Sequence, residues 1–143
     1  MKQISKFECG PMAARAKVIL MVYNSEDQKS VDRLAKFRGS SCPCGKKAGT
    51  PAGLSHFQKW ISTKGKDPIY VVINTHRKNS LDAVFNTLPH EINHVTAFIA
   101  EKMIIGAGEE PISYLSGYMN SQFQQALLKE LGYEVVKKEE KEE

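Results

Sequence analysis

Two short runs of apolar residues constrain the fold more than any other feature of this chain. Residues 17–23 and Ile69–Asn74 are rich in β-branched side chains, and polar turn-forming residues follow the first and precede the second. Runs of this length and composition are typical of buried β-strands. Both are much shorter than the ~20 apolar residues that a membrane-spanning helix needs. We therefore expect a sheet in the core and no membrane-spanning segment.

Two stretches with helical periodicity follow the second strand. We place the first over residues 87–105, with Thr87 as N-cap, because Pro89 is then in the first turn, where its missing N–H costs little. A kinked helix beginning at Ser80 is the alternative. The second helix covers residues 109–131 and stops at Gly132. Strands followed by helices predict an α+β fold.

The length of 143 residues, 41% of them hydrophobic, predicts one domain with a real core. We assign it to residues 1–133, with a Gly- and Pro-dense loop over 39–55 and a charged, disordered tail over 134–143. Residues 31–37 have the spacing of a short helix. Residues 54–61 fit either a helix or a short strand.

The N-terminus lacks the apolar core of a signal peptide, and three cysteines argue against a disulfide framework. Both features predict a protein that stays in the cytoplasm. Residues 1–80 are strongly basic and residues 81–143 acidic, although the net charge is only +4. The basic half is expected either to solubilise a loop-rich segment or to face an acidic partner such as nucleic acid.

The string His90-Glu91-Ile92-Asn93-His94 has the pattern H-E-x-x-H in a segment expected to be helical. Positions i and i+4 lie on one face of a helix, so both imidazoles can bind the same metal ion. The glutamate lies beside that ion, where it can act on a metal-bound water. We therefore predict a zinc site on His90 and His94, with Glu91 as general base.

Catalytic zinc usually has three protein ligands, and the third is sought downstream of His94. Glu109 and Glu110 follow a Gly-x-Gly turn and open the second helix, which can run back beside the first. Pro111 would hold that helix start rigid. We favour Glu110 as the third ligand, with Glu109 as the fallback.

This arrangement resembles small zincin-like proteins encoded by tailed bacteriophages. The resemblance covers about residues 69–120: a strand, H-E-x-x-H, and then Glu109-Glu110 leading into Tyr114-Leu115-Ser116-Gly117-Tyr118. The order is also that of the gluzincin metallopeptidases. The resemblance implies a minimal zincin-like domain: a short twisted sheet, the H-E-x-x-H helix and a Glu-bearing helix. It also implies a phage protein of the host cytoplasm, with incorporation into the virion as a further alternative.

The resemblance implies a mechanism as well. Zinc would lower the pKa of its bound water toward ~7, and Glu91 would take the proton as that water attacks a peptide carbonyl. Tyr114, Tyr118 or His76 would stabilise the oxyanion. An extended peptide would pair with the strand next to the cleft. That strand consists of Ile69, Tyr70, Val71, Val72, Ile73 and Asn74.

Three other interpretations stay open. The domain could be a non-catalytic virion or assembly protein with a structural zinc, contacting other phage structural proteins. The basic half could bind nucleic acid through lysines, with Trp60 as its only large stacking surface. A second zinc site could combine three cysteines with His56 or His76. The lysines are Lys46, Lys47, Lys64 and Lys66, and the cysteines are Cys9, Cys42 and Cys44.

Overall fold

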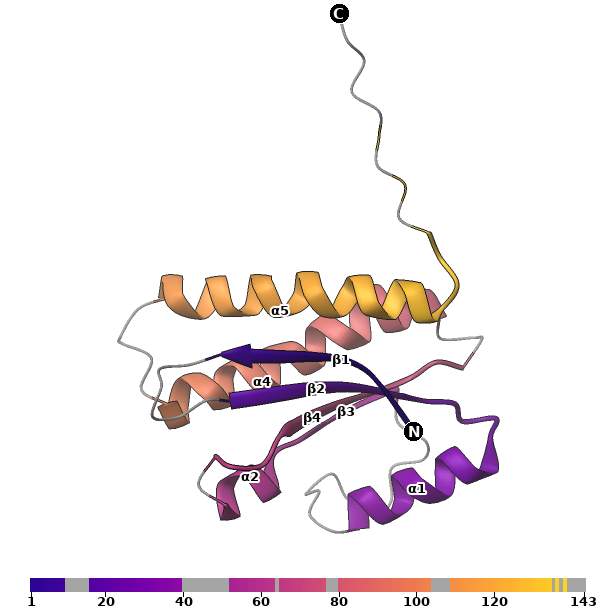
Figure 1. The fold of residues 1–143 in the computed structure, drawn as a ribbon, viewed down its shortest axis with the longest axis horizontal. Coiled ribbons are helices and arrows are strands. Elements are labelled where there is room, and N and C mark those ends of the chain that lie inside the picture. The colour runs from indigo at the N-terminus through magenta and orange to yellow at the C-terminus, as the bar shows by residue number, and fades with distance from the viewer. Residues whose placement is uncertain are drawn as a thin grey trace, which may run out of the picture.

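The computed structural model describes residues 1–9, 16–39, 52–63, 65–76, 80–103, 109–134, 136 and 138. They form a four-stranded mixed sheet with helices on both faces (Figure 1). The strand order is β1-β2-β4-β3, in which β2 and β4 are parallel and each outer strand is antiparallel to its neighbour. The strands are β1 (Lys2–Cys9), β2 (Ala16–Tyr23), β3 (Gly53–His56) and β4 (Ile69–Asn74). The α+β class predicted from the sequence is confirmed.

The two long helices α4 and α5 run antiparallel, side by side, on one face of the sheet (Figure 1). Helix α1 covers the other face, and the short helix α2 follows β3 directly. The helical elements are α1 (Gln28–Gly39), α2 (Gln58–Ser62), α3 (Ser80–Asp82), the π-helical segment η2 (Ala83–Thr87), α4 (Leu88–Met103) and α5 (Glu109–Glu130). Within the described residues, no helix combines the length and apolarity needed to cross a membrane.

The two predicted strands are both present, as β2 and β4. β1 was not predicted, and β3 overlaps residues 54–61, where a short strand was one of two alternatives. β1 carries charged residues at the sheet edge, so its apolar alternation is weak. β3 has only four residues and begins with glycine, a poor strand former. Residues 54–61, which fitted a helix or a strand, contain part of each. The predicted 39–55 loop therefore ends before β3, and residues 40–51 lie outside the description.

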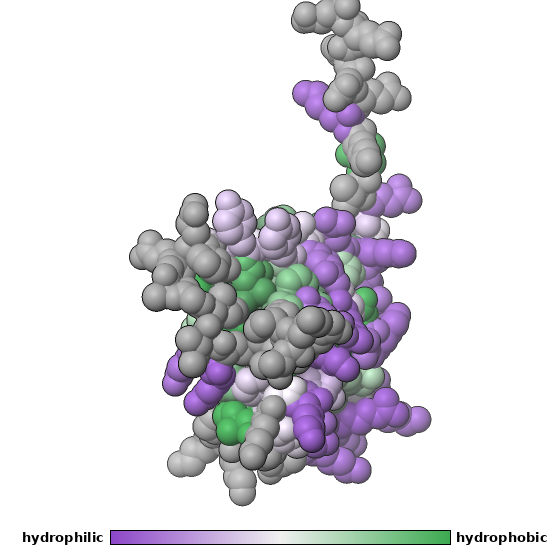
Figure 2. Space-filling model, turned by 60° about the vertical axis from the view of Figure 1, so that its left-hand side comes forward, coloured by the Kyte–Doolittle hydropathy of each residue, from purple (hydrophilic) through white to green (hydrophobic). Residues whose placement is uncertain are grey.

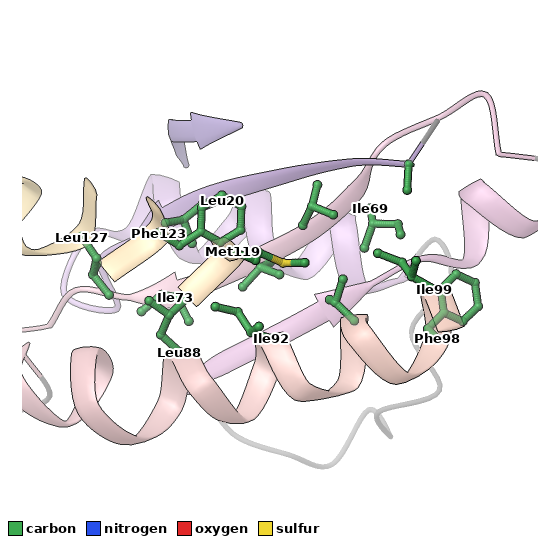
Figure 3. Packing of buried hydrophobic residues seen from close by; sticks show 14 of the residues in the cluster. Leu20, Ile69, Ile73, Leu88, Ile92, Phe98, Ile99, Met119, Phe123 and Leu127 are labelled. Atoms are coloured by element: carbon green, nitrogen blue, oxygen red, sulfur yellow. The ribbon is translucent and has the colours of Figure 1, made fainter. Parts of the chain in front are cut away.

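The main core lies between the sheet and the α4–α5 pair. Figure 3 shows side chains of β2 and β4 pointing toward those of the two helices. Burying each of these side chains contributes roughly 1.5–3 kcal/mol. A smaller cluster on the opposite face packs beneath α1. Fully buried members of the main core include Leu20, Ile69, Ile73, Leu88, Ile92, Ile99, Met119, Phe123 and Leu127.

The helix that carries the H-E-x-x-H motif begins at Ser80 rather than near Thr87, so the kinked alternative is the correct one. α3, η2 and α4 follow one another without a break. In η2 the N–H of Leu88 donates to the carbonyl of Ala83, five residues back. A proline inside a regular α-helix clashes with the carbonyl four residues before it. The wider π-turn before Pro89 relieves that crowding, and such turns often occur at functional sites.

Helix α5 starts at Glu109 and ends one residue before the predicted limit. Gly132 follows with a φ of +88°, a left-handed conformation that closes a helix. The surface seen in Figure 2 is mainly hydrophilic, with hydrophobic residues gathered near the middle of that view. The apolar side chains of α4 and α5 that face the sheet, such as Ile92 and Phe123, are fully buried.

Candidate functional site

His90 and His94 lie one turn apart on the outer side of α4, and both side chains are exposed. Their Nε2 atoms face each other at 3.1 Å, and the ring centroids are 4.7 Å apart. The predicted convergence of the two imidazoles is therefore present. The same distance also suits a hydrogen bond in which one neutral imidazole donates to the other. A shared metal ion and a direct hydrogen bond both require the two Nε2 atoms to face each other.

Glu91 points from α4 toward the edge of the sheet and is only 8% exposed. Its carboxylate Oε2 accepts a hydrogen bond from the hydroxyl of Ser55 in β3. That hydroxyl also lies 3.1 Å from the backbone oxygen of Glu91. Because it has a single proton, it donates to one of these oxygens at a time. Ser55 thus fixes the carboxylate in one orientation beneath β3.

Gly53 allows β3 to approach α4 closely enough for this contact. A Cβ atom at this position would lie 2.5 Å from Cγ2 of Thr87 and 2.9 Å from Cγ of Glu91. Real Cβ atoms essentially never make contacts this short, so any larger residue must displace the helix, the strand or the glutamate. The position of Glu91 therefore depends on a glycine far away in the sequence.

The third zinc ligand stays a prediction, because the side chains of Glu109 and Glu110 lie outside the described part. Among the residues that are described, no group of three His, Cys, Asp or Glu side chains could hold a metal. The backbone adds a constraint. His94 lies about 13 Å along the axis from the end of α4, and α5 then runs back alongside. Glu109 and Glu110 open α5, at the end of the helix pair where α4 finishes.

The strand predicted to bind substrate needs a correction. Ile69–Asn74 is a strand, but β2 pairs with one of its edges and β3 with the other. An extended peptide cannot add to a strand whose two edges are occupied. The outer edge of β3 faces no other strand within the described residues. β3 also carries Ser55, the partner of Glu91, so the edge nearest the motif is Gly53–His56.

The proposed oxyanion-stabilising residues lie on other elements. Tyr114 and Tyr118 are exposed on α5 and stack on each other, with ring centroids 6.4 Å apart. His76 follows β4, and its Nε2 lies 2.8 Å from the Glu26 carboxylate. These contacts, between the two tyrosines and between His76 and Glu26, do not include the histidine pair. Their catalytic role therefore stays a prediction.

The second zinc site cannot combine Cys9 with either predicted histidine. Cys9 is on β1 and His56 on β3, at opposite edges of the sheet, three strand spacings or about 14 Å apart. His76 follows the far end of β4, whereas Cys9 pairs with the first residue of β2. Burial also raises the pKa of the Cys9 thiol, which disfavours the ligating thiolate. Cys42 and Cys44 lie outside the described residues.

The nucleic-acid interpretation loses its stacking surface. Trp60 is buried, and its ring meets that of Phe98 edge-on at 5.2 Å. It is therefore part of the core, as its helical spacing suggested. Of the four lysines in that interpretation, Lys66 is exposed, while the other three lie outside the described residues. No aromatic side chain remains that the sequence had assigned to base stacking.

Sequence reasoning missed Gly53 and Ser55, the two residues that hold Glu91 in place. Neither belongs to a motif, and they lie 36 or more positions before the glutamate. The one available signal was a glycine beside a short apolar stretch, which can mark a close backbone approach. A glycine of this kind does not indicate which helix or strand packs against it.

The site joins one helix and one edge strand: two facing imidazoles on α4, and a glutamate between them that β3 holds. Imidazole and carboxylate are side chains that many metal sites use. Comparison of the chain with protein families, curated proteins and solved structures gave no match.

Proposed function

We propose that this protein is a zincin-like, zinc-dependent hydrolase of peptide bonds, of the type found in tailed phages. The observation that carries the proposal is the pair of facing Nε2 atoms, 3.1 Å apart, beside a glutamate held by the edge strand. His90 and His94 would hold the zinc ion, and Glu91 would act as general base. Function at this site needs helix α4 and strand β3 together.

The histidine pair fits a zinc ion. Two nitrogens bound to one tetrahedral zinc at 2.0–2.1 Å lie roughly 3.4 Å apart, within a few tenths of an ångström of the distance here. The bound ion would supply Lewis acidity, polarising a carbonyl and making water a better nucleophile near neutral pH. The remaining protein ligand is proposed to be Glu110, with Glu109 as the fallback.

The chain's own groups each have a defined task in this proposal. Glu91 accepts the proton of the attacking water and later passes it to the leaving amine. Ser55 holds the carboxylate near the outer edge of β3. A peptide extended along that edge would hydrogen-bond to the β3 backbone, which places its carbonyls next to Glu91. Burial of Glu91 limits competing contacts with bulk water.

A non-catalytic role is the second candidate, and one observation favours it. Glu91 is buried and hydrogen-bonded to a neighbouring strand, as a purely structural carboxylate would be. In that case zinc would staple the helix surface, and the protein would act as a virion or assembly component. The two candidates differ in whether removal of the Glu91 charge affects hydrolysis.

Substitution of Glu91 by glutamine separates these candidates. We expect the zinc-loaded wild-type protein to cleave members of a random peptide library, detected by mass spectrometry. Glu91→Gln should keep its zinc and lose about 10²–10⁴-fold in rate, the usual contribution of a general base. Glu101→Gln is the matched control, because it makes the same change at an exposed glutamate of α4 outside the motif. If the wild type binds zinc but cleaves no peptide, the catalytic role is rejected and the structural role is retained.

The third ligand has its own test. Zinc affinity is compared in Glu110→Gln, Glu109→Gln and Glu101→Gln, the last being an exposed glutamate on α4. We expect loss of affinity in Glu110→Gln alone. Equal affinity in all three variants would reject both glutamates as ligands and leave the histidine pair to share the ion with another group.

A further inference from the structure

A crevice lies at the end of the sheet where the parallel strands β2 and β4 finish, and it is lined by other residues than the histidine pair. These neighbouring strands are parallel, and the chain leaves them toward opposite faces of the sheet (Figure 1). From β2 it continues into α1, and from β4 into α3 and α4. In open sheets such a switch point creates a crevice beyond the carboxyl ends of the strands, where ligands commonly bind.

The crevice is present here as two adjoining cavities of about 360 Å³ and 440 Å³. Both are lined by Asn24, Thr75 and Glu130, so they form two lobes of one hollow. Each lobe is within the size range of small-molecule sites. The wall is well ordered by hydrogen bonds. The side-chain oxygen of the buried Asn74 accepts from the Ser25 N–H, and its amide nitrogen donates to the Ser25 hydroxyl. Thr75 donates through its N–H and its hydroxyl to the carbonyl of Tyr23.

The first lobe is lined by more basic than acidic side chains: those of Lys2, Lys29 and Arg33 against the carboxylates of Asp27 and Glu130. Lys29 and Arg33 line it from successive turns of α1, and neither takes part in an ion pair within the described chain. Glu130 pairs with Lys2 at 3.1 Å, which leaves Lys29 and Arg33 against the single charge of Asp27, whose carboxylate accepts from the Lys29 N–H. Like charges four residues apart weaken a helix unless a ligand neutralises them.

We propose that this crevice binds a small phosphate monoester, with its phosphate held between Lys29 and Arg33. Arginine suits bidentate binding of phosphate oxygens, and lysine adds a compact charge. The second lobe, lined by Leu131 and Tyr133, would receive the organic part of the ligand. The site is built from other residues than the histidine pair, so it stands whether or not the protein binds zinc.

The test uses adenosine monophosphate as probe and adenosine as its uncharged counterpart, in amide-resolved NMR titrations of the full chain. We expect adenosine monophosphate to shift resonances around Asn24, Lys29, Arg33 and Thr75, and adenosine to have no effect there. The double variant Lys29→Gln/Arg33→Gln should bind at least about ten-fold more weakly, since two charge-assisted contacts are lost. The matched control Lys36→Gln/Lys66→Gln removes the same charge from exposed positions elsewhere and should bind within two-fold of the wild type.

Three results would overturn the proposal. These are no shift with adenosine monophosphate at millimolar concentration, equal binding of adenosine, or an equal loss in the control variant. The last would indicate general electrostatic attraction only. A His90→Ala/His94→Ala variant should bind the nucleotide unchanged, so failure of the zinc proposal and failure of this one are distinguishable.

Discussion

The inner and outer sides of α4 have opposite properties within a single turn of helix. Ile92, Val95 and Ile99 on the inner side are fully buried against the sheet. His90 and His94 on the outer side are exposed. The inner residues hold the helix in place, whereas the outer ones contribute little to packing and are free to bind an ion. The residues that stabilise α4 and those proposed to bind zinc are therefore interleaved in the sequence.

Glu91 lies between these two sides and belongs to both. It is buried like the inner residues, but its carboxylate is placed by one polar contact from β3 rather than by apolar packing. The two histidines and the glutamate of the motif are therefore supported in different ways. The histidines need only the helix, and the glutamate also needs the strand. Substitutions on the two sides should accordingly have separable effects.

The largest expected effect is on the inner side. Ile92→Ala removes a fully buried side chain and leaves a cavity, so the free energy of unfolding should fall by about 2–5 kcal/mol. The neighbouring exposed change Asn93→Ala should stay within about 0.5 kcal/mol. Urea denaturation measures both. Similar losses in the two variants would contradict the assignment of the two sides.

On the outer side, His94→Ala should weaken zinc binding at least about 100-fold, beyond the effect typical of residues that only support a ligand. The unfolding free energy of the zinc-free protein should change by no more than about 0.5 kcal/mol, because the side chain is exposed. Competition with a chromophoric chelator gives the affinity. Zinc should also raise the melting temperature of the wild type and not of the variant. Unchanged affinity would remove His94 from the site.

The contact between α4 and β3 is tested by Gly53→Ala. The added Cβ would lie 2.5 Å from Thr87 Cγ2, and such overpacking typically costs about 1–3 kcal/mol. The displaced Glu91 should also lower hydrolysis more than it lowers zinc binding. Gly117→Ala is the control, since a Cβ there meets nothing within 4 Å. Wild-type stability in Gly53→Ala would show that the helix and strand are not in close contact.

Ser55→Ala should have a smaller effect, because it removes one hydrogen bond to the Glu91 carboxylate without adding bulk. Bonds to charged groups contribute about 1.5–3 kcal/mol, and partial exposure of Ser55 places this one at the low end. If Ser55 positions the general base, kcat should fall while KM and zinc affinity stay near wild type. Ser55→Thr keeps the hydroxyl and should restore part of kcat. A change in KM alone would assign Ser55 to substrate binding instead.

The smallest effect concerns His56, which alternates with Ser55 and points to the other face of β3. Its burial, and then the charge of Lys59, lower its pKa in the folded protein. Below about pH 6.5 the unfolded chain therefore binds the proton more readily, so stability decreases as pH falls. We expect His56→Gln to reduce this loss between pH 7 and 5.5 by about 1 kcal/mol or less. An unchanged pH dependence would mean that His56 titrates normally in the folded state.

The sequence predicts the outer side of α4 well, because helix geometry alone brings positions four apart onto one face. It predicts β2 and β4 for a similar reason, since both are continuous apolar runs. The partners of these elements were not predictable in the same way. β3 is short, contains glycine and histidine, and pairs with β4 in a register that no local pattern specifies.

The start of the motif helix shows a different limit. Pro89 correctly indicated that a regular helix could not extend backward without a change in geometry. Helix propensity favours a helix that begins near Pro89, whereas in the structure the helical segment begins earlier and passes through the π-turn of η2. The buried residues Ala83 and Val84 explain the choice, because packing against the core offsets the irregular turn. Tertiary burial thus decided between two starts that the sequence left open.

The central claim is that two imidazoles on α4 bind one zinc ion. Zinc-edge X-ray absorption of the metal-loaded, full-length protein tests it most directly. We expect two imidazole nitrogens at about 2.0–2.1 Å with oxygen in the other positions, and loss of this signal in His90→Ala/His94→Ala. Sulfur scattering near 2.3 Å, or no zinc retained after loading, would contradict it.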